Sequence, residues 1–269
     1  MIPCASASPV RDTVSFAILD GMGLLRISII GIDGSGKSTT TLRAIHSLSH
    51  QFSICKTGRN PIHACKGEIS YCLPGTAKLF EDLFKRVDST KKRGWIGLSR
   101  LLFVLFQGWL EPYMIKRYCP DLIMTTRCMV IDSTVYSDFY YPFLSQKLTI
   151  PGKLKLTQQY SRFPFRDLYF YLDTPIVTAM ARIHKRISDD HPEITYGRDY
   201  WLHLHEHEDS LKLLDLKFRE TLKVAQGRNR FKIIEIDTAI HNEEEVARLI
   251  SESSIGFYKG YLFGSWVKI

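Results

Sequence analysis

The feature that most restricts the fold is a glycine-rich loop between a short apolar segment and an expected helix. Residues 26–30 form an isoleucine-rich run, residues 31–38 read GIDGSGKS, and residues 39–49 have helical character. A strand followed at once by GxxxxGK[ST] and a helix is the arrangement in which backbone N–H groups cradle phosphate groups. The sequence therefore predicts a phosphate-binding loop at the carboxyl end of a buried strand.

Each position of the loop has an expected role in binding a nucleoside triphosphate and Mg²⁺. The Lys37 ammonium is expected to bridge the β- and γ-phosphates, and the Ser38 hydroxyl is expected to ligate the metal. Asp33 is expected to orient an accepting hydroxyl or take its proton, with a tie between the loop and a neighbouring strand as the alternative. The expected cofactors are ATP and Mg²⁺. The residues expected to bind them are Gly31, Gly34, Ser35, Gly36, Lys37, Ser38 and Thr39.

Strands alternate with helices along the rest of the chain. Strands are expected at residues 26–30, 52–56, 121–125, 167–172 and 231–236. Helices are expected at residues 39–49, 75–90, 95–117, 175–187, 199–226 and 242–252. This alternation predicts an α/β, three-layer P-loop NTPase fold, in which a parallel five-stranded sheet carries helices on both faces and a lid.

The expected domain boundaries follow from where this alternation begins and ends. Residues 1–24 precede the first strand and are interpreted as an N-terminal extension. Residues 25–252 form one P-loop domain, with a lid at about 183–198 that includes a polar loop. Residues 253–269 form an aromatic C-terminal tail. The tail is expected to dock onto its own domain, with a partner or membrane contact as the alternative.

The charge and composition of the chain limit the kinds of ligand and binding partner that are expected. The 36 Lys and Arg against 28 Asp and Glu give a net charge of +8, which attracts nucleotides, phosphorylated substrates and other polyanions, or is simply a solvated basic surface. No aromatic-basic motif supports nucleic acid as a partner. The most apolar window, 95–110, is too short to span a bilayer. Scattered cysteines without a CxxC pair, and no visible signal peptide, predict a cytoplasmic protein.

Residues 29–39, IIGIDGSGKST, resemble the opening of the thymidylate kinases, a group of nucleoside monophosphate kinases. Residues 165–175 and 232–250 are similar to that family's downstream strand with its proline, and to its closing strand and helix. Order and spacing agree over residues 25–252. The resemblance implies a P-loop kinase that moves the γ-phosphoryl group of ATP to a nucleoside monophosphate, with dTMP as the first acceptor to consider. It also implies a homodimer, for which the apolar face of 95–117 offers an interface.

The acceptor side of the resemblance contains substitutions. Arg127 matches an arginine that the family uses on the acceptor phosphate or the transferred group, whereas Thr126 replaces the aspartate before it. Asp132, six residues further on, could supply a carboxylate from another backbone position. Phe103 and Gln107 match a phenylalanine and the arginine that holds the acceptor phosphate, and a neutral amide cannot replace that charge-assisted contact.

Further expected site residues complete this comparison. Tyr136 echoes a residue of the family's base pocket, and Arg59 is a weaker candidate for the acceptor phosphate. The expected acceptor-binding residues are Asp33, Arg59, Phe103, Gln107, Arg127, Asp132 and Tyr136. In the lid, Arg182 and Arg186 share one helix face and are expected to place cations over the phosphates. The expected catalytic residues are Lys37, Asp33, Arg127, Arg182 and Arg186.

Two alternatives stay open at this point. The acceptor could be a sugar or a lipid-linked alcohol, which the apolar segment 95–110 would suit. A non-catalytic protein that binds nucleotide to switch a partner is the other alternative, because the aspartate at the end of the third strand is missing.

Overall fold

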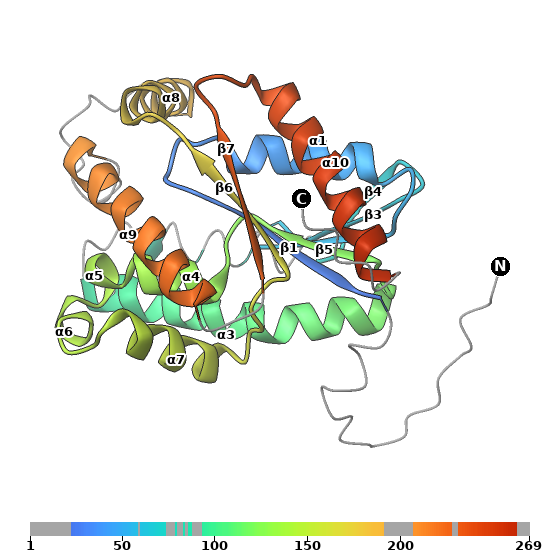
Figure 1. The fold of residues 1–269 in the computed structure, drawn as a ribbon. Coiled ribbons are helices and arrows are strands. Elements are labelled where there is room, and N and C mark those ends of the chain that lie inside the picture. Colours follow the sequence, from blue (N-terminus) through green and yellow to red (C-terminus); the bar gives the residue numbers. More distant parts are fainter. Residues whose placement is uncertain are drawn as a thin grey trace, which may run out of the picture.

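The computed structural model describes residues 23–58, 60–73, 79, 83, 86–87, 93–190, 207–227 and 231–262. The strands are β1 (Leu25–Ile30), β2 (Ile54–Thr57), β3 (Ile62–Cys65), β4 (Glu68–Tyr71), β5 (Leu122–Thr125), β6 (Leu168–Asp173) and β7 (Lys232–Asp237). The helices are α1 (Lys37–Leu48), α3 (Arg93–Tyr118), α4 (Met129–Val135), α5 (Ser137–Tyr140), α6 (Pro142–Ser145), α7 (Ile150–Ser161), α8 (Ile176–Asp190), α9 (Glu208–Gln226) and α10 (Glu243–Leu262). Figure 1 shows the helices arranged on both faces of a central sheet.

The sheet corrects the expectation of five parallel strands. It has seven strands in the order β4-β3-β2-β5-β1-β6-β7. The five expected strands are all present and parallel, whereas β3 and β4 add an antiparallel hairpin at the β2 edge. Lys66 and Gly67 turn this hairpin with φ of 52° and 79°, as a two-residue turn of the primed kind requires. Its strands are four residues each and partly exposed, so their apolar pattern is weak.

Alternate side chains of the parallel strands enter two different cores. Ile27 and Ile29 of β1 pack on the face that α1 and α10 cover, where Ile45 and Ile250 are fully buried. Ile30 lies in the opposite core, which α4, α7, α8 and α9 cover. Strands that are buried on both faces are nearly continuous in apolar residues, as β6 is. The two cores confirm helices on both faces of the sheet.

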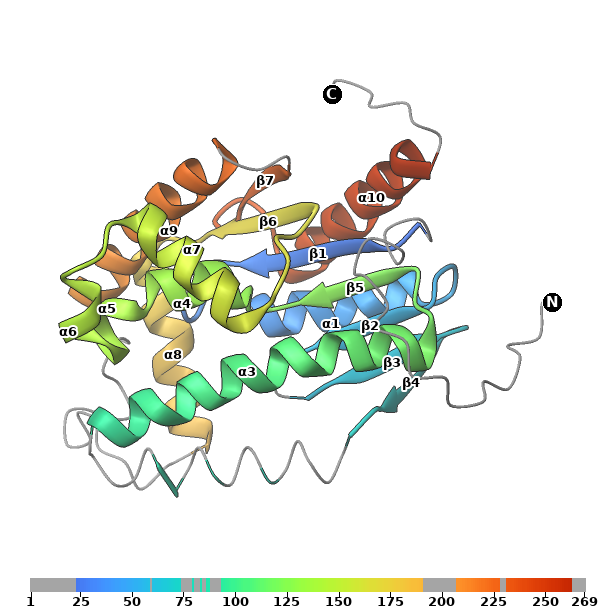
Figure 2. The same cartoon turned by 90° about the horizontal axis from the view of Figure 1, so that it is seen from below.

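Helix α3 covers the β2 and β5 side of the sheet and is the longest helix described. Leu110 and Met114 pack there against Cys55 and Ile123. Figure 2 shows α3 running along the sheet from end to end. Among the described residues, no helix combines the length and apolar character needed to cross a membrane.

Several segments differ from the expected elements. No helix or strand is expected from the sequence at residues 128–162, which contain the four helices α4 to α7. Helix α10 runs to Leu262 instead of ending near residue 252, so it continues into the expected tail. Residues 1–22, most of the helix expected at 75–90, the polar part of the lid at 191–198 and residues 263–269 lie outside the described residues.

The connections locate the crevice where a ligand can bind. Strands β1 and β5 are parallel neighbours, with Ser28 beside Thr125. After β1 the chain enters α1 on one face, and after β5 it enters α4 on the other. In open α/β sheets, ligands bind outside the carboxyl ends of strands at such a switch point. The glycine-rich loop and the segment around Arg127 both begin there.

Candidate active site

The glycine-rich loop wraps around the ammonium group of its own lysine. Lys37 Nζ donates hydrogen bonds to the carbonyl oxygens of Gly31 at 2.8 Å and Ile32 at 2.6 Å. The Ser35 hydroxyl lies 3.4 Å from the same nitrogen. The loop is therefore closed around a positive charge at the carboxyl end of β1.

Two glycines are required for the shape of this loop. Gly34 has φ of +81°, and a Cβ on it would lie 2.4 Å from the carbonyl oxygen of Ala179 in α8. Gly36 has φ of +84° and caps the amino end of α1. Side chains are disfavoured at such φ values, and at Gly34 one would also collide with backbone. The loop thus packs directly beneath α8.

The amino end of α1 has the properties of a phosphate site. Its first turn contains no acidic residue, so no side chain of the helix itself offsets the positive end of the helix dipole. Ser38 and Thr39 are exposed in this turn. No group of three or more His, Cys, Asp or Glu side chains within the described ranges could hold a metal by itself. A hydroxyl at Ser38 fits Mg²⁺, which uses few protein ligands when nucleotide phosphates supply the others.

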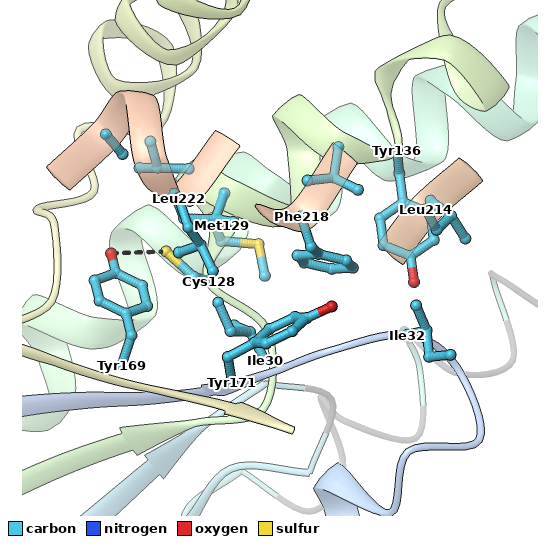
Figure 3. Close-up of a cluster of buried hydrophobic side chains, with 14 of the residues drawn as sticks. Ile30, Ile32, Cys128, Met129, Tyr136, Tyr169, Tyr171, Leu214, Phe218 and Leu222 are labelled. Atoms are coloured by element: carbon cyan, nitrogen blue, oxygen red, sulfur yellow. Dashed lines mark hydrogen bonds between the residues drawn. The ribbon is translucent and has the colours of Figure 1, made fainter. Parts of the chain in front are cut away.

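Asp33 is held by a tyrosine from the opposite side of the crevice. Tyr136, at the end of α4, donates a hydrogen bond from its hydroxyl to Asp33 Oδ2 at 2.9 Å. Figure 3 shows the hydroxyl end of Tyr136 directed toward the loop that carries Ile32. Burial, followed by the charge of Asp33, raises the pKa of Tyr136 well above 10, so this hydroxyl stays a donor. The interaction joins the phosphate loop to α4.

Arg127 extends from the segment that follows β5. The Thr125 hydroxyl donates to the carbonyl oxygen of Arg127 at 2.8 Å and accepts from its N–H at 3.2 Å, which fixes the turn. Burial lowers the pKa of Arg127, but the charge of Asp33 and the nearby tyrosines raise it, and the net shift is upward. Arg127 is therefore a permanent cation at the crevice.

Asp132 is the second carboxylate of the site and lies in α4. It is 8% exposed, and its Oδ2 has no hydrogen-bond partner within the described residues. Burial raises its pKa to about 6, although the charges of Arg127 and Lys37 lower it.

The charged groups of the site converge on Lys37. Burial lowers the pKa of Lys37, the carboxylates of Asp33 and Asp132 raise it, and Arg127 and Arg186 lower it. Residues from the loop, from the end of β5, from α4 and from α8 therefore act on one ammonium group. The structure thus gathers five expected site residues that are far apart in the sequence.

An aromatic pocket opens beside these charges, between α3 and α4. Its aromatic lining consists of Phe103, Tyr136, Tyr140 and Tyr141, and its charged lining of Arg100, Arg127 and Asp132. The Arg100 guanidinium lies 5.4 Å from the centre of the Tyr140 ring. Four expected acceptor-binding residues thus line one pocket next to the phosphate loop.

Gln107 is engaged elsewhere. Its Oε1 accepts from the N–H of Gly58 at 3.0 Å, and its Nε2 donates to the carbonyl oxygen of Gly58 at 3.1 Å. The side chain is 1% exposed, so it ties α3 to the end of β2. Its role in acceptor binding stays a prediction that the present geometry does not favour. Arg59, the next residue after Gly58, lies outside the described residues.

The lid arginines are placed over the loop. Arg182 Nη1 donates to the carbonyl oxygen of Gly34 at 3.4 Å. Arg186, one turn further along α8, influences the pKa of Lys37. Both side chains therefore approach the expected phosphate position from the same helix.

Three of the aromatic and charged residues that line the pocket were not expected from the sequence, namely Arg100, Tyr140 and Tyr141. Arg100 interrupts an apolar helix face, and a charged residue at such a place could have been identified as a candidate for ligand binding. Tyr140 ends α5 and Tyr141 follows it, in a stretch with no clear periodic pattern, so the sequence offered no comparable signal.

The fold and the phosphate loop together define an α/β P-loop fold of the kind found in kinases. Solved structures with a similar fold include a deoxyadenosine kinase from M. mycoides with the products dCMP and a flexible dCDP bound. It is 17% identical, with 86% of this chain and 100% of that chain covered, at a TM-score of 0.53. The same enzyme with bound dATP is 16% identical, with 86% and 99% covered, at a TM-score of 0.50.

At these identities the likeness shows the fold alone. No protein-family model matches the chain, and no curated protein sequence matches it either. The resemblance to thymidylate kinases in particular remains a prediction, because these structural neighbours are nucleoside kinases.

Proposed function

We propose that this protein is an ATP-dependent kinase that transfers the γ-phosphoryl group to a nucleoside-like acceptor. The observation that carries the proposal is the convergence of Asp33, Asp132 and Arg127 on Lys37, directly beside the aromatic pocket. A nucleotide switch protein would need the phosphate loop but not a charged pocket of this kind next to it.

The binding of ATP is supported by the loop and by α8. Lys37 is positioned to exchange its bonds to backbone carbonyls for bonds to phosphate oxygens, and Arg182 and Arg186 approach from above. Mg²⁺ beside Ser38 would neutralise charge on the phosphates that are being separated. In such transfers positioning and charge stabilisation supply most of the rate, so this arrangement suits the reaction.

Two residues, Asp132 and Gln107, favour an acceptor hydroxyl over an acceptor phosphate, although Arg100 and Arg127 also line the pocket. The Asp132 oxygen that has no partner in the described part of the chain can accept a hydrogen bond from a hydroxyl, but it would repel a phosphate. Where thymidylate kinases have an arginine for the acceptor phosphate, this chain has Gln107. The amide of Gln107 is hydrogen-bonded to the backbone of Gly58. The aromatic lining suits a flat base. A nucleoside therefore fits better than dTMP, and a sugar or lipid-linked alcohol fits the aromatic lining less well.

The structural neighbours agree with this choice at the level of fold. They are structures of a deoxyadenosine kinase with deoxynucleotides bound. Deoxyadenosine and deoxycytidine are accordingly the first acceptors to test, with dTMP as the comparison.

The test is the release of ADP from Mg·ATP in the presence of deoxyadenosine, deoxycytidine, thymidine, dTMP and a polyprenol. The expected result is turnover with a nucleoside and little with dTMP. Lys37→Ala is the matched negative control, because it removes the phosphate-binding cation while leaving the packing of α1 intact. Turnover with dTMP alone would return the assignment to a thymidylate kinase. ATP binding without turnover on any acceptor would favour the switch protein.

The same proposal includes a homodimer formed through α3. Its exposed apolar side chains are Trp95, Leu98, Leu102, Leu105, Trp109 and Tyr113. They follow one another at intervals of three and four residues, which is the spacing of a seam between two packed helices. A second copy related by a twofold axis would present the same stripe, so the two surfaces would match.

A further inference from the structure

The two carboxylates of the site are in different chemical situations. Asp33 already accepts a hydrogen bond from Tyr136, and this bond fixes the loop against α4. Asp132 is almost completely buried and its Oδ2 accepts from no described residue, although it lines the aromatic pocket. Buried polar atoms normally have partners, so an unpartnered oxygen at a pocket calls for an explanation.

The position of Asp132 is fixed by its helix and by a hydrogen bond that its carboxylate accepts from the backbone of Cys128, which lowers its pKa. It lies within α4, where its N–H donates to the carbonyl oxygen of Cys128 at 2.7 Å. The carboxylate is thus presented to the pocket from a helix that packs on the core. A rigid helix holds a catalytic group more accurately than a loop does.

Charged groups face Asp132 from three other elements. They are Lys37 and Asp33 of the phosphate loop, Arg127 after β5, and Arg100 of α3 across the pocket. The cations keep the carboxylate from being fully neutralised by its burial, and its pKa rises only to about 6. A carboxylate of this kind is ionised at neutral pH and is a stronger base than an exposed one.

We propose that Asp132 is the general base of the transfer. This role rests on the proposed kinase function. The acceptor O–H gives its proton to Asp132 Oδ2 while its oxygen forms a bond to the γ-phosphorus of ATP. The bond from the γ-phosphorus to the β–γ bridging oxygen breaks, and its electron pair leaves with ADP. The proton then passes from Asp132 to water, so the products are ADP, the phosphorylated acceptor and a proton.

The experiment compares Asp132→Asn and Asp132→Glu with the wild type, using deoxyadenosine and deoxycytidine as acceptors across pH 5 to 9. For Asp132→Asn we expect kcat to fall by about 100-fold or more, the usual contribution of a general base, with little change in the KM for ATP. The wild-type kcat should decline below about pH 6 as Asp132 is protonated, and this acid limb should be absent in Asp132→Asn. Asp132→Glu should recover part of the lost rate.

The matched control is Asp209→Asn, an exposed aspartate of α9 outside the site, for which wild-type kinetics are expected. Calorimetry of deoxyadenosine binding to each variant separates a base from a binding residue, because loss of the base should weaken binding much less than turnover.

An active wild type combined with an Asp132→Asn variant that keeps its kcat and its acid limb would overturn the role of Asp132 while leaving the kinase function standing. A wild type that phosphorylates no acceptor would overturn both.

Discussion

At the scale of single residues, the site distinguishes polar side chains that hold the structure from those left available for a ligand. Gln107 satisfies both ends of its amide on Gly58 and is thereby a structural residue. Asp132 leaves an oxygen that has no partner among the described residues, at the cost of desolvation. A buried charge without a compensating partner destabilises the folded state. Such a charge is therefore typical of functional sites.

This cost leads to a prediction about stability and pH. The folded state raises the pKa of Asp132 from 3.8 to about 6, so it binds the proton more tightly than the unfolded chain does. The favourable contribution of Asp132 to the free energy of unfolding is therefore fully present below about pH 4, and it is lost as the pH rises through about 6. Asp132→Asn, which never charges, should raise the free energy of unfolding at pH 8 by about 3 kcal/mol.

Urea unfolding at pH 5, 6.5 and 8 measures this effect, and the gain over the wild type should shrink toward pH 5. Asp209→Asn, which changes an exposed carboxylate, should stay within about 0.5 kcal/mol of the wild type throughout. A variant less stable than the wild type at pH 8 would show that the Asp132 carboxylate has stabilising partners in the fold.

At the scale of elements, the contact between α8 and the phosphate loop decides the geometry of the site. Ala179 packs against Gly34, and Arg182 reaches the carbonyl oxygen of that glycine one turn later. Ala179 and Ile183 of the amphipathic helix α8 pack in the core, and this packing fixes the position of the α8 arginines relative to the loop. Small residues at this contact are therefore part of the site.

Replacing Gly34 with alanine should separate the loop from α8. The new Cβ would lie 2.4 Å from the Ala179 carbonyl oxygen at a φ of +81°. We expect a loss of about 1–3 kcal/mol in unfolding free energy and weaker ATP binding. Gly256→Ala is the matched control. Gly256 is exposed in α10 with no atom within 4 Å of an added Cβ. The same substitution there should stabilise by up to about 1 kcal/mol. Equal effects at both glycines would contradict the close packing of α8.

The arginines of α8 can be tested separately from the packing. Arg182→Ala and Arg186→Ala should each lower kcat by about tenfold or more, with a smaller change in ATP affinity, because their charges matter most as the phosphoryl group moves. Lys185→Ala, which changes an exposed side chain of the same helix, should have kinetics within about twofold of the wild type. Wild-type rates in both arginine variants would show that these arginines are solvated surface charges with no part in catalysis.

At the scale of the whole molecule, the exposed stripe of α3 is made of residues other than those with which this helix lines the pocket. The opposite side of α3 packs with Leu110 and Met114 on β2 and β5, so both sides of the helix are apolar. A stripe of this length, which includes two tryptophans, is unusual on a protein that stays monomeric.

The homodimer is tested by Leu102→Glu, which places a charge at the middle of the stripe. Leu102 is 45% exposed, so the substitution should leave the fold intact while it weakens the association of two copies. Sedimentation velocity should show a dimer for the wild type and a monomer for the variant. Ile240→Glu changes a residue that is 73% exposed in the turn after β7, and it should remain dimeric. A monomeric wild type would instead leave the stripe free for a different partner.

The sequence predicted the parallel part of the fold well, because its signals are local. Buried parallel strands such as β1 and β6 are continuous apolar runs, and the phosphate loop is a contiguous motif with a fixed strand and helix around it. The β3–β4 hairpin escaped prediction because its strands are short and extend the sheet edge by pairing, β3 with β2 and β4 with β3. Helices α4 to α7 escaped because their burial depends on contacts with distant helices such as α9.

The sequence by itself determined that the chain folds as an α/β protein with a phosphate-binding loop, because backbone conformation at glycines and the period of apolar residues are properties of neighbouring residues. Only the tertiary structure decided what surrounds that loop. It brought Asp132, Arg127 and Tyr136 to the loop from the opposite side of a topological switch point, and it engaged Gln107 with Gly58. Which polar groups find partners depends on contacts between residues far apart in the chain, and no local pattern encodes those contacts.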